Sequence, residues 1–135
     1  MAFRYLLDTD TCIYIRDKRP PQALARFEAT APGEMAMSVI TYGELLFGVL
    51  KDSGSRQAVA TVRRIQEHVP ALPLPANAAE TYGHIRAALE RTGNIIGAND
   101  LWIAAHALAS GLTLVTNNER EFKRVKELKI ENWAK

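Results

Sequence analysis

The sequence predicts an α/β domain built on a largely parallel sheet of about five strands. Short apolar runs of strand length recur along the chain, and most show no clean alternation of apolar and polar residues, as expected of strands buried on both faces. Longer segments with the apolar spacing of helices lie between these runs. A regular alternation of strands and helices is typical of α/β domains with parallel sheets.

The element positions follow from these two patterns. We expect strands at residues 3–7, 35–38, 71–74 and 112–116, with a weaker one around Ile130. We expect helices at residues 11–17, 22–29, 41–51, 56–68, 77–91, 100–110 and 119–128. The Pro- and Gly-containing stretches "RPPQ", "APGE" and "PALPLPAN" read as connections between them.

Composition indicates a folded globular protein. The 135 residues, of which 47% are hydrophobic and 24% charged, fit one compact domain spanning residues 1–135. We find neither an uninterrupted apolar stretch of about 18 to 20 residues nor a signal-peptide pattern, so we expect a cytoplasmic protein without a membrane span. The single cysteine excludes an internal disulfide and a Cys-ligated zinc site. A net charge of +2 gives little support by itself to a nucleic-acid partner.

Three acidic residues follow the apolar runs at positions where such a sheet forms a site. Asp8 ends the first strand, Glu44 lies near the start of the helix after the second, and Asp100 opens the helix that leads into the fourth. Open parallel sheets bind ligands beyond the carboxyl ends of their strands. The three side chains are therefore expected to converge at one edge of the sheet.

Each acid also has a local explanation. Asp8 or Asp10 could cap the helix expected at residue 11, and we assign the cap to Asp10 because Asp8 is still attached to the strand. Glu44 could be a first-turn glutamate favoured by the helix dipole, but the surrounding "TYGELLFGVL" is otherwise apolar. Asp100 follows Asn99, a suitable N-cap, so dipole stabilisation alone could account for it.

Three carboxylates in one cleft need compensation, because neighbouring like charges raise one another's pKa values. No Lys or Arg adjoins any of them in the sequence. A divalent cation provides this compensation, and ligands that are all oxygen favour Mg²⁺ or Mn²⁺ over zinc. Such an ion leaves room for a phosphate oxygen and an activated water, which suits hydrolysis of a phosphoester.

Small polar residues follow the fourth strand in "LVTNNEREF". Thr116, Asn117 and Asn118 can orient a metal-bound water or a phosphate without adding charge, or can simply form a turn that caps the next helix. Glu119 and Glu121 come next, and either could supply a fourth acid; Glu121 is the candidate we retain.

Other chemistries find little support. His68, His84 and His106 lie in separate expected helices with no i, i+4 pair, which argues against a histidine metal site. We find no nucleophile elbow and no phosphate-binding glycine loop. Aromatic residues are only 7% of the chain, so binding of single strands by stacking is disfavoured, and we expect Trp102 and Trp133 to pack or to form an interface.

With these residues assembled, the chain resembles PIN-domain proteins, and most closely the VapC type of ribonuclease toxin. The resemblance covers nearly the whole chain. It rests on "YLLDTDTCIY", "MSVITYGELLFG", "GNIIGANDLWIAAHALASGLTLVTNNEREFKRV" and the closing "ENW", in this order and spacing.

The resemblance implies a three-layer α/β sandwich whose acidic pocket holds Mg²⁺ or Mn²⁺. Asp8 and Asp100 match the metal-binding aspartates, and Glu44 matches the glutamate of that pocket, acting directly or through a water. Thr116 to Asn118 match the strand-end motif, but asparagine stands where many PIN domains have another aspartate. Asp10 falls where relatives accept Asn or Ser, in line with a capping role.

The resemblance further implies endonucleolytic cleavage of RNA, often tRNA, as the toxin of a type II toxin-antitoxin module. Implied partners are a VapB-type antitoxin and a second copy of the chain, assembling as a homodimer and as a heterotetramer or larger complex with the antitoxin. We expect apolar residues of "YIRDK" and "YGELLFGVL" to line the groove for the antitoxin tail. A PIN nuclease of RNA processing is the alternative within the family.

Two other classes of protein share parts of this pattern. "LLDTDT" also resembles the opening of haloacid-dehalogenase-like phosphatases, but "GAND" precedes "LVTNN", the reverse of their order. A phospho-acceptor receiver or an inactive PIN-like binding module is the non-enzymatic reading. An inactive module would be expected to have lost one of the three acids, and all three are present.

Overall fold

The computed structural model describes residues 2–135 and contains a five-stranded sheet in the order β3-β2-β1-β4-β5. Every pair of neighbouring strands is parallel. The strands are β1 (Tyr5–Leu7), β2 (Met35–Ser38), β3 (Ala71–Leu72), β4 (Thr113–Val115) and β5 (Ile130–Glu131). The predicted parallel sheet of about five strands is confirmed.

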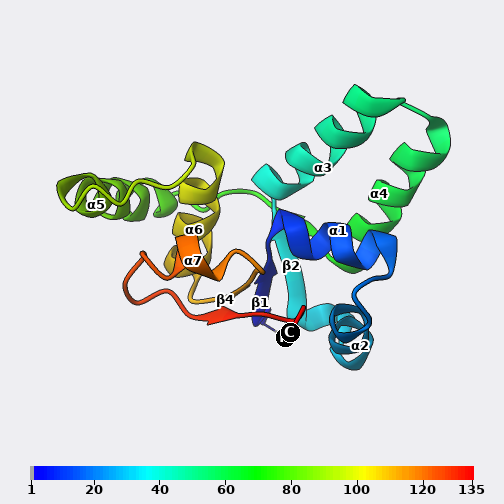
Figure 1. Cartoon of the computed structure of the whole chain (residues 1–135), viewed down its shortest axis with the longest axis horizontal. Helices are drawn as coiled ribbons and strands as arrows, with labels where there is room; N and C mark the ends of the chain where they lie inside the picture. Colours follow the sequence, from blue (N-terminus) through cyan, green and yellow to red (C-terminus); the bar gives the residue numbers. More distant parts are fainter. Residues whose placement is uncertain (1) are drawn as a thin grey trace.

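Helices cover both faces of this sheet (Figure 1). They are α1 (Thr9–Asp17), α2 (Pro21–Ala29), α3 (Val39–Asp52), α4 (Arg56–His68), α5 (Ala78–Arg91), α6 (Ala98–Ser110) and α7 (Glu119–Phe122), with a 3-10 turn at Pro32–Glu34. Helices α1 to α4 contribute to one core cluster, and α5 to α7 contribute to the other. Within residues 2–135 no helix is both long enough and apolar enough to cross a membrane.

Strand β1 shows why the apolar runs lack alternation. Leu6 packs into the core formed with α5, α6 and α7, while Tyr5 and Leu7 pack into the core on the opposite face. All three are buried. Because each face of the sheet meets a layer of helices, both sets of side chains must be apolar.

Several predicted elements are shorter in the structure. Strand β3 ends at Leu72 because Pro73 follows and cannot donate to a ladder. Helix α7 ends at Phe122 instead of residue 128. The chain then runs through turns to β5, and Glu127 takes the left-handed conformation (φ 71°), which a helix cannot continue through.

Three helices begin two residues earlier than predicted, at Thr9, Val39 and Ala98. Helices α1 and α3 therefore start directly at the ends of β1 and β2, and Ser38 caps α3 by accepting a hydrogen bond from the Ile40 N–H (3.1 Å). Helix α6 ends at Ser110, and the next residue, Gly111, has a φ of 68° that suits glycine and turns the chain straight into β4. These tight connections place the N-termini of α1 and α3 at the carboxyl edge of the sheet.

Candidate active site

The carboxyl ends of β1 and β4 lie where α1 and α7 begin (Figure 1). A cluster of acidic side chains lies at this edge of the sheet. The backbone N–H of Asp8 donates to the Val115 carbonyl (2.9 Å), which fixes the ends of the two strands side by side. Helix N-termini carry partial positive charge, so this edge of the sheet tolerates anions better than the opposite edge would.

Asp8 is the most deeply buried of these acids, at 5% exposure. Its Oδ1 accepts a hydrogen bond from the Thr9 N–H (2.7 Å), and its Oδ2 accepts one from the Thr116 hydroxyl (2.9 Å). Burial raises the pKa of Asp8 to about 7, with a further contribution from Asp10, although both hydrogen bonds oppose the rise. Without a compensating cation, the ionised form of this carboxylate is destabilised at neutral pH.

Asp8, and not Asp10, caps helix α1. The prediction that assigned the cap to Asp10 was wrong because α1 begins at Thr9, immediately after the strand. Asp10 lies in the first turn, and its Oδ2 accepts a hydrogen bond from the Asn117 N–H (3.2 Å). Burial raises the pKa of Asp10 as well. Both aspartates therefore face the end of β4.

Glu44 reaches the same region from the second turn of α3. Its Oε1 accepts a hydrogen bond from the Thr9 hydroxyl (2.5 Å), and its Oε2 accepts one from the Asn99 side-chain amide (3.2 Å). These donors come from α1 and α6 and are both neutral. Two neutral donors on different helices thus orient the carboxylate on both sides.

Asp100 lies in the first turn of α6. Burial raises its pKa to about 6, and the next largest contributions come from Glu121 and Glu44. Glu121 in turn accepts a hydrogen bond from the N–H of Gly97, the residue that caps α6 (3.4 Å). The structure therefore brings Asp100, Glu44 and Glu121 into one electrostatically coupled group.

The strand-end loop, residues 116–118, connects β4 to α7. Thr116 is buried, and its hydroxyl both donates to Asp8 and accepts from the Asn118 N–H (2.9 Å). The Asn118 side chain donates to Glu121, whereas the Asn117 side chain donates to the Tyr14 hydroxyl (2.9 Å). Asn118 precedes α7 but makes no side-chain capping bond.

The two glutamates of α7 differ in direction. Glu119 pairs with Lys135 (2.7 Å) and accepts from Asn132 (2.8 Å), and these contacts lower its pKa to about 2. Glu121 faces Asp100. Of the two, Glu119 is therefore paired with lysine, whereas Glu121 contributes to the electrostatics of Asp100.

No Lys or Arg forms an ion pair with Asp8, Asp10, Glu44, Asp100 or Glu121 in the part of the chain that the structure describes. The arginines nearest Asp8 in the sequence are engaged elsewhere, Arg4 with Glu34 (2.9 Å) and Arg16 with Asp17 (2.9 Å). This group of acids therefore carries negative charge that no described Lys or Arg side chain pairs with, and such a group attracts a cation.

The donor set suits Mg²⁺ or Mn²⁺ because all of these ligand atoms are carboxylate oxygens. As the side chains stand, no three carboxylate, imidazole or thiol groups among residues 2–135 lie close enough together to share one ion. Mg²⁺ needs only one or two carboxylates and keeps several waters. The residue types thus fit such an ion, and Asp8 and Asp100 are the residues that would hold it.

The sequence did not predict a role in the site for four polar residues of this region. Thr9 and Asn99 orient Glu44, and Tyr14 and Asn132 hold Asn117. Thr9 and Asn99 each adjoin a predicted acid in the sequence, which was an available signal. For Tyr14 and Asn132 the local sequence offered none.

Residues predicted to be structural behave accordingly. Trp102 stacks on Tyr82 (ring centroids 3.9 Å apart), and Trp133 meets Tyr5 edge-on (5.3 Å). Cys12 is a buried free thiol. Of the three histidines, His106 is buried in α6, and His68 bonds only the carbonyl of its own helix.

The sequence profile of the PIN domain matches residues 5–128. This range contains strands β1 to β4 and ends just before β5. The chain therefore belongs to the PIN-domain family. This family assignment agrees with the parallel sheet and with the acidic cleft at its carboxyl edge.

Named relatives narrow the assignment. Ribonuclease VapC2 of Haemophilus influenzae is 41% identical over 97% of this chain and 98% of its own length. The tRNA(fMet)-specific endonuclease VapC of Shigella flexneri is 37% identical over the same shares. A crystal structure of VapBC2 from Rickettsia felis bound to a promoter DNA fragment has a chain with a TM-score of 0.89 and 38% identity, covering 97% of this chain and 99% of that one. Within its family the chain is a nuclease of the VapC type, a ribonuclease toxin of a toxin-antitoxin system.

Proposed function

We propose that this single-domain toxin is a Mg²⁺- or Mn²⁺-dependent endoribonuclease that cleaves tRNA and is inhibited by a VapB-type antitoxin. One observation carries the metal dependence. Burial and neighbouring acids raise the pKa values of Asp8 and Asp100 to about 7 and about 6, and no Lys or Arg among residues 2–135 forms an ion pair with either.

In this proposal Asp8 and Asp100 hold the ion. When bound, the divalent cation offsets the charge of these carboxylates and supplies Lewis acidity for hydrolysis of the phosphodiester. Glu44, held by Thr9 and Asn99, is placed to position a water or to accept its proton. The Asn118 side-chain amide donates to Glu121 and so orients the Glu121 carboxylate beside Asp100.

The choice of tRNA rests on the name of the Shigella flexneri relative, a tRNA(fMet)-specific endonuclease. To cut a folded RNA at one position, the enzyme must bring an exposed phosphodiester of that RNA next to the acidic residues. The cleft lies at the surface, since Asn99, Gly97 and Asn117 around it are exposed, so a looped-out strand of a folded RNA can reach it.

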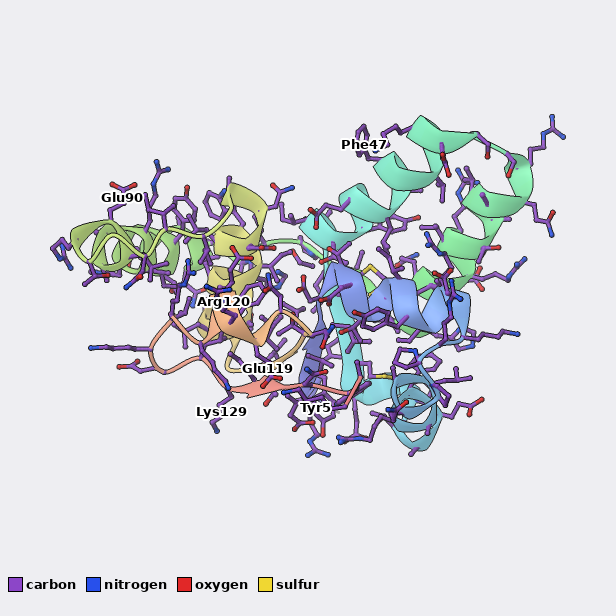
Figure 2. All side chains as sticks on the ribbon, in the orientation of Figure 1. Tyr5, Phe47, Glu90, Glu119, Arg120 and Lys129 are labelled. Carbon is purple, nitrogen blue, oxygen red and sulfur yellow. The ribbon has the colours of Figure 1, made fainter. Side chains whose placement is uncertain are left out.

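An apolar stripe on α3 supports a binding position for the antitoxin beside the acidic residues. Val39, Phe47 and Leu50 are exposed at 44%, 63% and 61%, and Phe47 projects from the outer side of the helix (Figure 2). A pocket of about 710 Å³ joins this stripe to Thr9, Glu44 and Asn99. An antitoxin segment lying on the stripe would cover the cleft, and a second copy of the chain could bury the rest of it.

The first experiment tests metal-dependent cleavage. Purified protein is incubated with total tRNA in Mg²⁺, in Mn²⁺ and in EDTA, alongside Asp8→Asn and Asp100→Asn. Asp52→Asn is the matched control, because Asp52 is exposed at the far end of α3. We expect cleavage by wild type and by the control in metal only; undiminished cleavage by Asp8→Asn would refute the site.

A second experiment separates a tRNA-cleaving toxin from a nuclease of RNA processing. Induction of the chain should arrest growth, and co-expression of the small protein encoded beside it should relieve the arrest. Accumulation of cut tRNA during arrest supports tRNA as the substrate, whereas cuts confined to other RNAs contradict that choice.

A further inference from the structure

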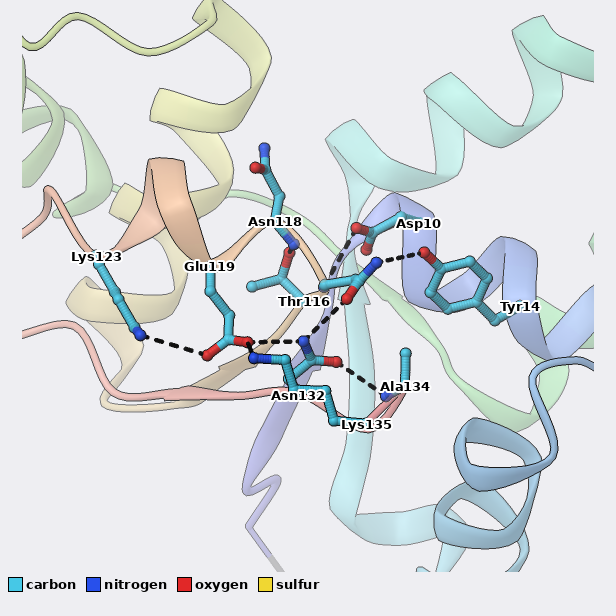
Figure 3. A network of polar contacts seen from close by, with 10 residues as sticks. Asp10, Tyr14, Thr116, Asn118, Glu119, Lys123, Asn132, Ala134 and Lys135 are labelled. Carbon is cyan, nitrogen blue, oxygen red and sulfur yellow. Dashed lines mark hydrogen bonds and ion pairs between the residues drawn. The ribbon is translucent and has the colours of Figure 1, made fainter.

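The C-terminal segment, residues 132–135, lies against the strand-end loop (Figure 3). The side-chain amide of Asn132 donates to the Asn117 side-chain oxygen (2.9 Å) and to Glu119 (2.8 Å). The Asn132 oxygen accepts a hydrogen bond from the Ala134 N–H (2.9 Å). One side chain at the end of the protein thus connects the last residues to the loop that carries Thr116.

The residues on either side of Asn132 are held in place by the rest of the fold. Trp133 is 1% exposed and packs edge-on against Tyr5 of β1. Its indole N–H donates to Glu131 (3.0 Å), and the Arg26 guanidinium lies over its ring at 5.2 Å. The anchor on both sides of Asn132 fixes where its amide points.

The bonding pattern requires an amide at residue 132. Both of its N–H groups are used toward acceptors, and its oxygen is used toward a donor. A carboxylate of the same shape has no N–H to donate, and it would face the carboxylate of Glu119. A small apolar side chain would leave both acceptors without this partner.

On the other side of the contact, Asn117 links the C-terminal segment to α1. Its side-chain N–H donates to the Tyr14 hydroxyl (2.9 Å), and its backbone N–H donates to Asp10 (3.2 Å). The preceding residue, Thr116, donates to Asp8 (2.9 Å). Any shift of the strand-end loop therefore moves the donors that orient both aspartates.

We propose that Asn132 is a positioning residue, which acts through Asn117 to hold the strand-end loop so that Asp8 keeps the orientation in which it binds the divalent cation. This inference rests on the proposed metal-dependent function and adds to it a residue outside the cleft. Residues that orient metal ligands typically affect metal affinity or activity by about 10- to 100-fold.

The test compares Asn132→Ala, Asn117→Ala and the double variant with wild type. Asn94→Ala is the control, because Asn94 is an exposed asparagine whose side chain bonds only Thr92. Thermal unfolding in EDTA checks folding. The affinity for Mg²⁺ alone, without RNA, is then obtained from the rise in Tm on titration, and kcat and KM are measured on total tRNA.

We expect each single variant to bind Mg²⁺ about tenfold more weakly and to lose kcat by a similar factor. KM should change by less than about twofold in Asn132→Ala, because the proposed role of Asn132 is exerted through Asn117 and not through the RNA. Since Asn132 acts through Asn117, the double variant should lose no more Mg²⁺ affinity or kcat than the more impaired of the two single variants. Asn94→Ala should match wild type.

Wild-type Mg²⁺ affinity in both single variants overturns the inference while leaving the proposed function intact. Additive losses in the double variant also overturn it, since the two residues would then act separately. If wild type itself neither binds the ion nor cleaves RNA, the proposed function fails, and the inference fails with it. Should Asn132→Ala fold poorly, Asn117→Ala tests the same link from an exposed position.

Discussion

Replacing Asp8 by asparagine should stabilise the metal-free protein at neutral and alkaline pH. The carboxylate is 5% exposed, and burial together with Asp10 raises its pKa from 3.8 to about 7. Asparagine has the same shape but carries no charge, so it removes the cost of burying the ionised form. Its side-chain oxygen can still accept the helix-capping hydrogen bond from the Thr9 N–H.

The size and sign of the effect follow from proton linkage. The folded state holds the proton of Asp8 more tightly than the unfolded state, so stability is fully present below pH 3.8 and is lost as the pH rises through about 7. Each pKa unit is worth about 1.4 kcal/mol, which gives a loss of about 4 kcal/mol in wild type. Asp8→Asn does not undergo this loss. At pH 8 it should exceed wild type by about 4 kcal/mol, or roughly 12 to 16 °C in Tm.

The assay is urea unfolding in EDTA at pH 4, 6 and 8, followed by tryptophan fluorescence, with Asp52→Asn as the exposed control. We expect wild type and Asp8→Asn to converge at pH 4 and to separate progressively toward pH 8. If Asp8→Asn is no more stable than wild type at pH 8, the carboxylate is not strained, and the electrostatic argument for a cation is refuted.

Three further predictions concern the cleft and the α3 stripe. At pH 8, Mg²⁺ at about 100 times its wild-type dissociation constant should stabilise wild type by about 3 kcal/mol in thermal unfolding. An equal gain in Asp100→Asn at the same Mg²⁺ concentration would show that Asp100 does not bind the ion. Thr9→Val deprives Glu44 of its 2.5 Å donor and should lower single-turnover cleavage about tenfold, whereas Thr9→Ser should retain the rate; equal rates would contradict the role of this bond. Phe47→Asp should change the free energy of unfolding by less than about 0.5 kcal/mol but abolish antitoxin capture in a pull-down, and intact capture would place the antitoxin elsewhere.

The fold was largely predictable because its signals are local. Apolar runs such as residues 35–38 and the apolar spacing of the helices reflect burial that each segment needs wherever it packs. The errors fell at element ends. Helix α7 ends at Phe122 because the chain must return beside β4, a requirement set by the sheet and absent from the sequence of the helix itself.

The candidate acids were also predictable, since residues that follow parallel strands gather at one edge of the sheet. The division of roles was not. Asp8 and Asp10 carry the same side chain two residues apart, and which of them caps α1 depends on where the helix starts after β1. Glu119 and Glu121 are likewise distinguished by tertiary contacts, because Lys135 and Asn132 reach Glu119 from the last residues of the chain.

The sequence by itself determined the class of fold, the acidic composition of the cleft and the membership of the family, because burial patterns and the order of motifs are properties of the chain. Only the tertiary structure decided the direction of each polar side chain. Asn132 meets Asn117 and Thr9 meets Glu44 across separations of 15 and 35 residues. Such pairs form when packed elements bring distant segments within hydrogen-bond distance, and no local propensity encodes them.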